Sequence, residues 1–288
     1  MQPPRIMGVV NVTPDSFSDG GRYRDHDAAV THGRALAAQG ADIVDVGGES
    51  TRPGAEPVPV GDELERVLPV VEGLAAAGIR VSIDTRKAEV AEAAVRVGAS
   101  LVNDVSASLA PVAAATGAGF VAMHMSGDPR TMQRHPHYDD VVAEVRDFLV
   151  SRAEAAVDAG VGEVWIDPGI GFGKRLEHNL DLLANIDVLV ATRFPVLVAI
   201  SRKSMLGTLA GRADRSRSRL GARADEIGSV AATADAPTPT SDRLEGSLAM
   251  AAWALWRGVA MVRVHEVAET VRVVEAVRAV GVASEAAA

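Results

Sequence analysis

Three polar residues in the sequence follow short apolar runs and have side chains suited to holding a flat heterocycle. Asp84, Asn103 and Asp167 each stand at or near the end of a run rich in Val and Ile. Two carboxylates and an amide match a ring edge with adjacent N–H groups, as in guanine or a pterin. Either aspartate alone could instead cap the helix that follows it. The residues thus support two interpretations, a heterocycle clamp and ordinary helix capping.

A second group of polar residues is basic and lies around the last two apolar runs. Ser201, Arg202 and Lys203 follow the seventh run, whereas Arg263 and His265 belong to the end of the eighth. Barrels of alternating strands and helices often bind phosphate at this place. We therefore predict an anion site, with a solvated surface charge as the alternative interpretation of Arg202.

The first apolar run ends in a candidate metal ligand, Asn11. Its amide oxygen could complete the coordination of Mg²⁺ held mainly by a diphosphate and water, although a turn residue at the end of a strand is the alternative. Two loops rich in Gly and small polar residues, Thr13–Tyr23 and Gly47–Pro59, are candidate lids.

The elements that must position these residues alternate along the chain. Continuous apolar runs are typical of parallel strands covered on both faces, and Ala-rich helical stretches separate them. Eight such units in one series predict an α/β fold, a single-domain (β/α)8 TIM barrel, whose active site forms where the strands end. The predicted strands are Arg5–Val12, Ala41–Val46, Arg80–Asp84, Ser100–Asp104, Gly119–Met123, Glu163–Asp167, Pro195–Ala199 and Met261–Val264. The predicted helices include Asp27–Gln39, Val60–Ala77, Lys87–Val97, Tyr138–Ala159 and Arg243–Trp256.

We assign residues 1–280 to this barrel. One segment, 207–241, is rich in Arg, Ala, Ser, Thr and Pro and interrupts the alternation before the eighth strand. It is predicted to be a surface insertion, flexible or partly helical, with a substrate lid as the alternative. Residues 281–288 are expected to form a frayed tail.

The composition excludes several classes of protein. Of the 288 residues, 48% are hydrophobic and 23% charged, so the chain can bury a sizeable core. Cysteine is absent, which excludes a disulfide scaffold, a cysteine nucleophile and a thiolate metal site. A net charge of -9 argues against nucleic acid as a partner. With no run of about 18 apolar residues and no export signal, we expect a cytoplasmic protein without a membrane partner.

Eight motifs, in chain order, resemble the dihydropteroate synthase family and cover nearly the whole chain except the 207–241 segment and the tail. The resemblance implies a (β/α)8 barrel, a homodimer, and a transferase of folate biosynthesis that is the target of sulfonamides. Such an enzyme joins (7,8-dihydropterin-6-yl)methyl diphosphate to 4-aminobenzoate, releases diphosphate in an SN1-like displacement and uses Mg²⁺. The motifs are Asn11–Gly21, Glu49–Gly54, Ser82–Thr85, Asn103–Ser106, Met123–Met125, Asp167–Lys174, Ser201–Ser204 and Arg263–His265.

The resemblance also implies roles for single residues. The pterin and its diphosphate would contact Thr51, Asp84, Asn103, Met123, Asp167, Lys203, Arg263 and His265. The 4-aminobenzoate pocket would contain Phe17, Thr51, Arg52, Pro53, Phe172, Ser201, Lys203 and Ser204. Asn11 would bind Mg²⁺, and the catalytic residues would be Asp19, Lys203, Arg263 and His265. The sequence departs mildly from the family pattern at Ala199 and Glu266, where many relatives have Gly and Asp.

Three other functions stay open from the residues alone. A pterin-dependent methyltransferase would share the pterin pocket, but its methyl donor carries no diphosphate that would need the basic residues. A Schiff-base aldolase would use Lys203, and trapping with borohydride would reveal it. A pterin-binding paralogue without turnover would have lost residues such as Asp19, Arg52 or Lys203, and all three are present.

Overall fold

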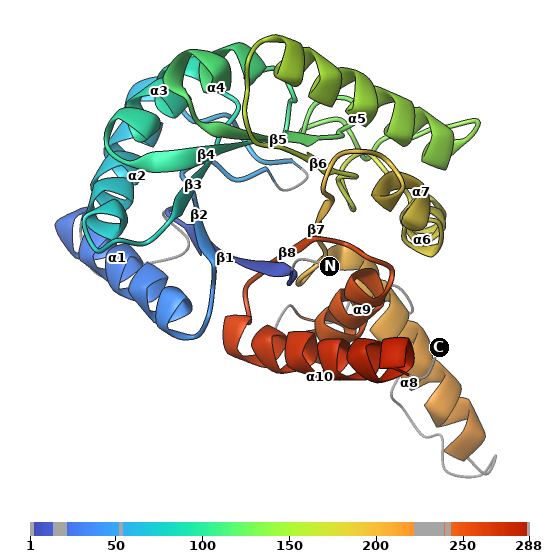
Figure 1. Ribbon diagram of the computed structural model, residues 1–288. Coiled ribbons are helices and arrows are strands. Elements are labelled where there is room, and N and C mark those ends of the chain that lie inside the picture. Colours follow the sequence, from blue (N-terminus) through green and yellow to red (C-terminus); the bar gives the residue numbers. More distant parts are fainter. Residues whose placement is uncertain (1–2, 14–21, 52–53, 222–238, 240–242, 287–288) are drawn as a thin grey trace.

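Eight parallel strands form a barrel around which helices are arranged in a ring (Figure 1). This computed structural model describes residues 3–13, 22–51, 54–221, 239 and 243–286. The hydrogen-bonded order is β6-β5-β4-β3-β2-β1-β8-β7. Between β7 and β6 the barrel closes at a bridge that pairs Ile166 with Val196. The strands are β1 Arg5–Asn11, β2 Ile43–Gly47, β3 Val81–Asp84, β4 Ala99–Asp104, β5 Gly119–Met123, β6 Val164–Asp167, β7 Leu197–Ala199 and β8 Met261–Val264. The predicted single-domain TIM barrel is confirmed.

The helices follow the strands as the alternation predicts, and local chemistry sets their ends. For example, α5 begins at Val141, later than the predicted Tyr138, because the side chain of Asp140 caps it by accepting from two backbone N–H groups. The chain leaves this helix through Gly160, at φ +97°, a backbone conformation that favours glycine. The helices are α1 Arg22–Ala38, α2 Val60–Ala75, α3 Ala88–Arg96, α4 Ala110–Thr116, α5 Val141–Asp158, α6 Leu176–Ala184, α7 Asp187–Val190, α8 Ser204–Gly221, α9 Leu244–Trp256 and α10 Val267–Ala286.

The core has two parts because successive strand residues point to opposite faces. Outward-facing Val, Ile and Ala residues pack under the helices in one large cluster. A separate cluster fills the inside of the barrel and consists of Met7, Ile43, Leu101, Val121, Trp165, Leu197, Ala199 and Met261. This inner apolar layer is the floor on which the polar residues at the strand ends rest.

The 207–241 segment begins inside a helix. Figure 1 shows α8 leaving the barrel and extending away from it. Residues 222–238 and 240–242 lie outside the described residues, so the role of the segment stays a prediction. At the other end of the chain, α10 remains helical past Val280 to Ala286. In the described part of the chain, every helix is too short or too polar to cross a membrane.

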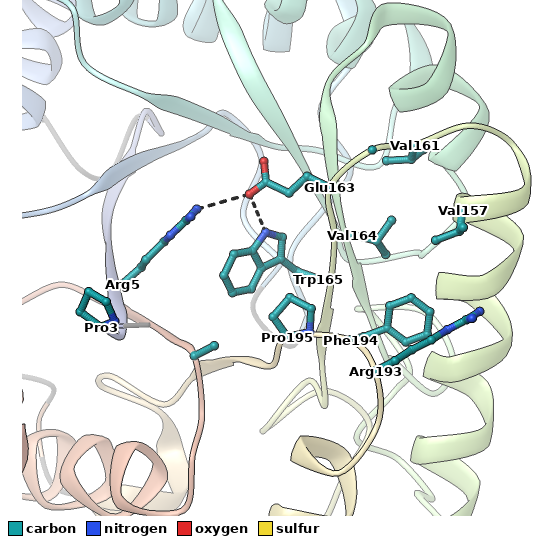
Figure 2. Close-up of a pocket in the computed structure, with 12 residues that line it drawn as sticks. Pro3, Arg5, Val157, Val161, Glu163, Val164, Trp165, Arg193, Phe194 and Pro195 are labelled. Carbon is teal, nitrogen blue, oxygen red and sulfur yellow. Dashed lines mark hydrogen bonds and ion pairs between the residues drawn. The ribbon is translucent and has the colours of Figure 1, made fainter. Parts of the chain in front are cut away.

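The N-terminal end of the barrel carries a shallow hollow of about 420 Å³ (Figure 2). Glu163 stands at its centre and accepts hydrogen bonds from Arg5 (3.4 Å), Arg80 (2.5 Å) and the indole N–H of Trp165 (2.8 Å). The two arginines and the glutamate are each about one third exposed. The predicted site residues that the structure describes lie at the opposite end.

Candidate active site

At the C-terminal end of the barrel, Arg263 of β8 links two carboxylates. Its Nε donates to Oδ2 of Asp45 (2.6 Å) and its Nη2 donates to Oδ2 of Asp84 (2.8 Å). Arg263 pairs in register with Met7 and Ala199, both members of the inner apolar layer, so its side chain points into the barrel. Since Asp45 is fully buried and Arg263 is only 17% exposed, this ion pair lies largely out of water.

Other strands bring an amide and a third aspartate to the same end. Asn103 stands beside Asp84 in register and donates from Nδ2 to Oδ2 of Asp45 (3.0 Å). Further round the barrel, Asp167 stands beside Met123 in register and accepts a hydrogen bond from the backbone N–H of Gly169 (2.7 Å). The predicted clamp residues therefore meet around one mouth.

Burial sets the protonation of this cluster. It raises the pKa of Asp84 to about 7, although Arg263 acts in the opposite direction. Burial also raises the pKa of Asp167 to about 6 and lowers that of Lys203 to about 8. The cluster can therefore exchange protons near neutral pH, as groups in binding and catalytic sites often do.

A cation and an aromatic ring form one wall of the mouth. The ammonium of Lys203 lies 4.0 Å from the ring centroid of Phe172, within the range of a cation–π interaction. Lys203 begins the turn into α8, whereas Phe172 belongs to the loop after β6. A flat ligand that meets this wall would find an apolar face beside a positive charge.

The loop after β6 is held in place by close packing at Gly169 and by the buried side chain of Lys174. An added Cβ at Gly169, where φ is +63°, would lie 1.9 Å from the backbone oxygen of His124, so only glycine allows this close approach. The buried ammonium of Lys174 bonds to Nδ1 of His124 (2.8 Å) and to the backbone oxygens of Gly169 and Phe172 (both 3.1 Å). Burial lowers the pKa of Lys174 to about 7 and that of His124 to about 3.

The last two strands end in a polar chain. The Ser201 hydroxyl lies 2.9 Å from Nδ1 of His265 and 3.0 Å from Oε2 of Glu266. Glu266 also forms an ion pair with Arg202, whose side chain is 45% exposed. This pairing and exposure fit the alternative interpretation of Arg202 as a surface charge, and a contact with an anion stays a prediction. Glu266 carries that pair.

Comparison with known proteins decides the family. Residues 7–265 match the family described as pterin binding enzymes. The dihydropteroate synthase of Escherichia coli (strain K12) is 43% identical over 283 residues, 95% of this chain and 91% of that protein. The chain belongs to the dihydropteroate synthase family.

Two solved dihydropteroate synthases are similar in structure as well. That of Xanthomonas albilineans with 4-aminobenzoic acid has a TM-score of 0.83 and 44% identity, covering 97% of this chain and 94% of that one. That of Burkholderia cenocepacia complexed with 7,8-dihydropteroate has a TM-score of 0.80 and 39% identity, covering 99% and 94%. The sequence-based assignment to the dihydropteroate synthase family is confirmed.

The structure places most predicted site residues of this dihydropteroate synthase family member at one end of the barrel. Asn11 ends β1 and Thr51 follows β2, both partly exposed, and Ser204 is exposed at the start of α8. Among the others, Asn103, Met123, Asp167 and Ser201 are buried, and the partly exposed ones are Asp84, Phe172, Lys203, Arg263 and His265. Four predicted residues, Phe17, Asp19, Arg52 and Pro53, lie outside the described residues.

Helix capping does not explain the two aspartates. The N-cap positions of α3 and α6 are Lys87 and Arg175, so the capping interpretation of Asp84 and Asp167 is wrong. Asp104 has the turn-closing role instead, because it accepts from the backbone N–H groups of residues 106, 108 and 109 at 2.6–2.8 Å.

Sequence reasoning missed Asp45. A signal was present, since a carboxylate in the middle of the apolar run Ile43–Gly47 is rare unless it has a partner. Lys174 belongs to the Asp167–Lys174 motif, but the motif alone predicts no role for it. Its contacts show that it fixes the loop after β6.

Proposed function

We propose that this chain catalyses the dihydropteroate synthase reaction of folate biosynthesis. (7,8-Dihydropterin-6-yl)methyl diphosphate and 4-aminobenzoate would give 7,8-dihydropteroate and diphosphate. The observation that carries the proposal is a largely buried charged cluster at the strand ends of a chain of this family, made of Asp84, Asn103, Asp167, Lys203 and Arg263.

The pterin would bind edge-on to the cluster. The carboxylates of Asp84 and Asp167 would accept from the ring N–H and amino groups, while Lys203 would donate to a ring acceptor and balance their charge. Asn103 would offer its amide beside Asp84, and Met123 would pack on the ring face. An anionic clamp of this kind favours a ring that becomes electron-poor as the diphosphate leaves.

Bond breaking would precede bond making. The C–O bond to diphosphate breaks and its electron pair leaves with the oxygen, whose charge Arg263 and His265 disperse. The pterin methylene carries the resulting positive charge, shared with the ring, until the lone pair of the arylamine forms the C–N bond. The ammonium product then loses one proton to diphosphate or water, so no protein nucleophile is needed.

The second substrate would approach along the wall of Phe172 and Lys203. The ring would pack on Phe172, and the carboxylate of 4-aminobenzoate would lie toward the polar Ser201 and Ser204 at the start of α8. Phe17, Thr51, Arg52 and Pro53, with Asp19, would complete this side as the loops order and exclude water from the cation. Sulfonamides, which resemble 4-aminobenzoate, would compete for the same place.

Mg²⁺ would be held chiefly by the substrate. The described residues contain no cluster of three or more His, Asp or Glu that could bind a metal by themselves. Asn11 ends β1 in register with Gly47 of β2, which in turn stands in register with Asp84 of β3. One neutral oxygen fits an ion coordinated mainly by diphosphate and water. When bound, Mg²⁺ would help to neutralise the leaving diphosphate.

We further propose a cytoplasmic homodimer. Trp253 and Trp256 of α9 are 42% and 53% exposed, and large exposed aromatic side chains are enriched where protein surfaces associate. Light scattering at micromolar concentration tests this part separately.

An assay of diphosphate release tests the reaction. The protein is given dihydropterin diphosphate and Mg²⁺, with and without 4-aminobenzoate, and dihydropteroate is measured in parallel. Release that requires the arylamine and equals the dihydropteroate formed supports the proposal. Equal release without the arylamine, or binding of the pterin without any release, would support a hydrolase or a paralogue without turnover.

A further inference from the structure

We propose that Asp45 is a positioning residue for the reaction, the fixed partner that holds Arg263 and Asn103 in place beneath the substrate. The inference rests on the proposed function, since it concerns how two of the proposed ligand contacts are aligned. Asp45 itself lies below the mouth and has no exposed surface.

The topology puts Asp45 between its two partners. β2 stands two strands from β8 on one side and two strands from β4 on the other. One carboxylate oxygen, Oδ2, accepts from Nε of Arg263 (2.6 Å) and from Nδ2 of Asn103 (3.0 Å). A single buried oxygen atom therefore fixes Arg263, which is proposed to bind the diphosphate, relative to Asn103, which is proposed to bind the pterin.

Stability alone does not account for an aspartate here. A charged group in the inside of a barrel loses its hydration, and an apolar residue of similar volume is often as stable or more so. Within the described part of the chain, the other oxygen of Asp45 has no hydrogen-bond partner, and neither has the hydroxyl of Ser82, its register neighbour on β3. The contacts that Asp45 does make are with two residues of the site, Arg263 and Asn103.

The two carboxylates that bind Arg263 differ in their exposure to solvent, which indicates different roles. Asp84 is 15% exposed and is a proposed pterin ligand, so a bound pterin would compete with Nη2 of Arg263 for it. Asp45 is 0% exposed and out of reach of the substrate. As Asp84 exchanges Arg263 for the pterin, the bond to Asp45 keeps the guanidinium paired and aimed at the diphosphate.

Asp45→Asn tests this role because it keeps the shape and removes the charge, and Ser82→Ala is the matched control. Ser82 is equally buried, at the same level of the barrel, and has no described contact with a site residue. For Asp45→Asn we expect kcat/KM for dihydropterin diphosphate to fall about thirtyfold or more, with KM for 4-aminobenzoate within about threefold of wild type. Ser82→Ala should leave both constants unchanged. Equal effects of the two variants would overturn the proposal.

A second variant guards against misfolding and separates positioning from general destabilisation. Arg263→Lys keeps a cation but loses the Nε donor, so it should reproduce the fall in kcat/KM for the pterin substrate. Adding Asp45→Asn to it should cost less than Asp45→Asn costs in the wild type, because one of the two contacts of Asp45 is already lost and only that to Asn103 remains. Fully multiplied losses, or an unchanged kcat/KM in Arg263→Lys, would overturn the role of Asp45.

The outcome is distinguishable from failure of the proposed function. If the wild type releases no diphosphate, the proposed function fails. Calorimetry with inorganic diphosphate then still tests whether Asp45 holds Arg263 in place as the anchor of the diphosphate site. Weaker binding in Asp45→Asn than in Ser82→Ala would then support the anchor, and equal binding would overturn it.

Discussion

The two ends of the barrel carry the same kinds of charged residue in opposite arrangements. At the N-terminal end one carboxylate, Glu163, lies between Arg5 and Arg80. At the C-terminal end one guanidinium, Arg263, lies between Asp45 and Asp84. The first cluster is about one third exposed and has an excess of positive charge, whereas the second is largely buried and has an excess of negative charge.

The difference shows what makes a charged cluster chemically useful. Water screens the N-terminal cluster, so its ion pairs contribute little. At the C-terminal end the buried negative excess is costly until a ligand with N–H donors, or a proton, balances it. The pKa of Asp84, raised to about 7 by burial and by the neighbouring Asp45 against the effect of Arg263, reflects this cost. The C-terminal cluster is built to receive a partner, and the N-terminal one already has its partners.

The largest effect should come from removing a clamp carboxylate. Asp167→Ala leaves the N–H groups of a bound pterin without an acceptor and should weaken binding of dihydropterin diphosphate by about 3 kcal/mol or more, roughly a hundredfold. Calorimetry measures the dissociation constant directly. Near-unchanged binding would show that Asp167 does not hold the pterin. The contrast between a ligand-binding C-terminal end and a self-paired N-terminal end would then lose its main support.

The pH dependence should be the next largest effect and should belong to one end only. The clamp carboxylates must be ionised to accept N–H donors. Therefore kcat/KM for the pterin substrate should fall about tenfold per pH unit between the pKa values of Asp84 (about 7) and Asp167 (about 6), and more steeply, toward about a hundredfold per unit, below both. It should also fall above about 8, where Lys203 loses its proton. A profile recorded from pH 5 to about 9 should therefore be bell-shaped.

The same shifts fix the sign of a stability effect. Between the ordinary carboxyl pKa of 3.8 and the raised values, the folded protein holds protons that the unfolded chain has released. Asp84 and Asp167 therefore lower the free energy of unfolding as pH rises through this range. Asp167→Asn should make the free energy of unfolding, measured by denaturant titration at several pH values, fall less steeply with pH. An unchanged dependence on pH would contradict the raised pKa of Asp167.

A change beneath the wall of the mouth should have an intermediate effect. Lys174→Met removes the ammonium that holds His124, Gly169 and Phe172, so the loop after β6 should loosen. We expect about 3 kcal/mol of lost stability and a KM for 4-aminobenzoate raised about tenfold, with the pterin constant changed less.

Tyr138→Phe is the matched control for Lys174→Met. The Tyr138 hydroxyl donates to the backbone oxygen of Gly173 (2.8 Å), so this variant removes one tether of the same loop from a less buried place. Its effect should be smaller, about 1 kcal/mol. Equal effects on KM in the two variants would show that Lys174 has no particular part in placing Phe172.

The sequence predicted the barrel and its site unequally. Parallel strands buried on both faces leave continuous apolar runs, so strands such as Gly119–Met123 were predicted to the residue. Asp84 and Asp167 were found because they stand where such runs end. Asp45 was not, since its partners on β4 and β8 lie far along the chain, and only the closed barrel brings them together. The pKa shifts depend on burial, which no local pattern reveals.

The smallest effect should come from the N-terminal cluster. Glu163→Gln removes the charge that faces Arg5 and Arg80, but the amide oxygen can still accept from the indole of Trp165. Because the ion pairs are solvated, we expect at most about 1 kcal/mol of lost stability, the wild-type pH profile, and kcat/KM within about twofold of wild type. Trp165 lies in the inner apolar layer between the N-terminal cluster and the site, so its indole fluorescence reports on a change in that layer. A shifted pH profile in Glu163→Gln, with indole fluorescence changed in parallel, would mean that the layer transmits charge effects and that the two ends do not act independently.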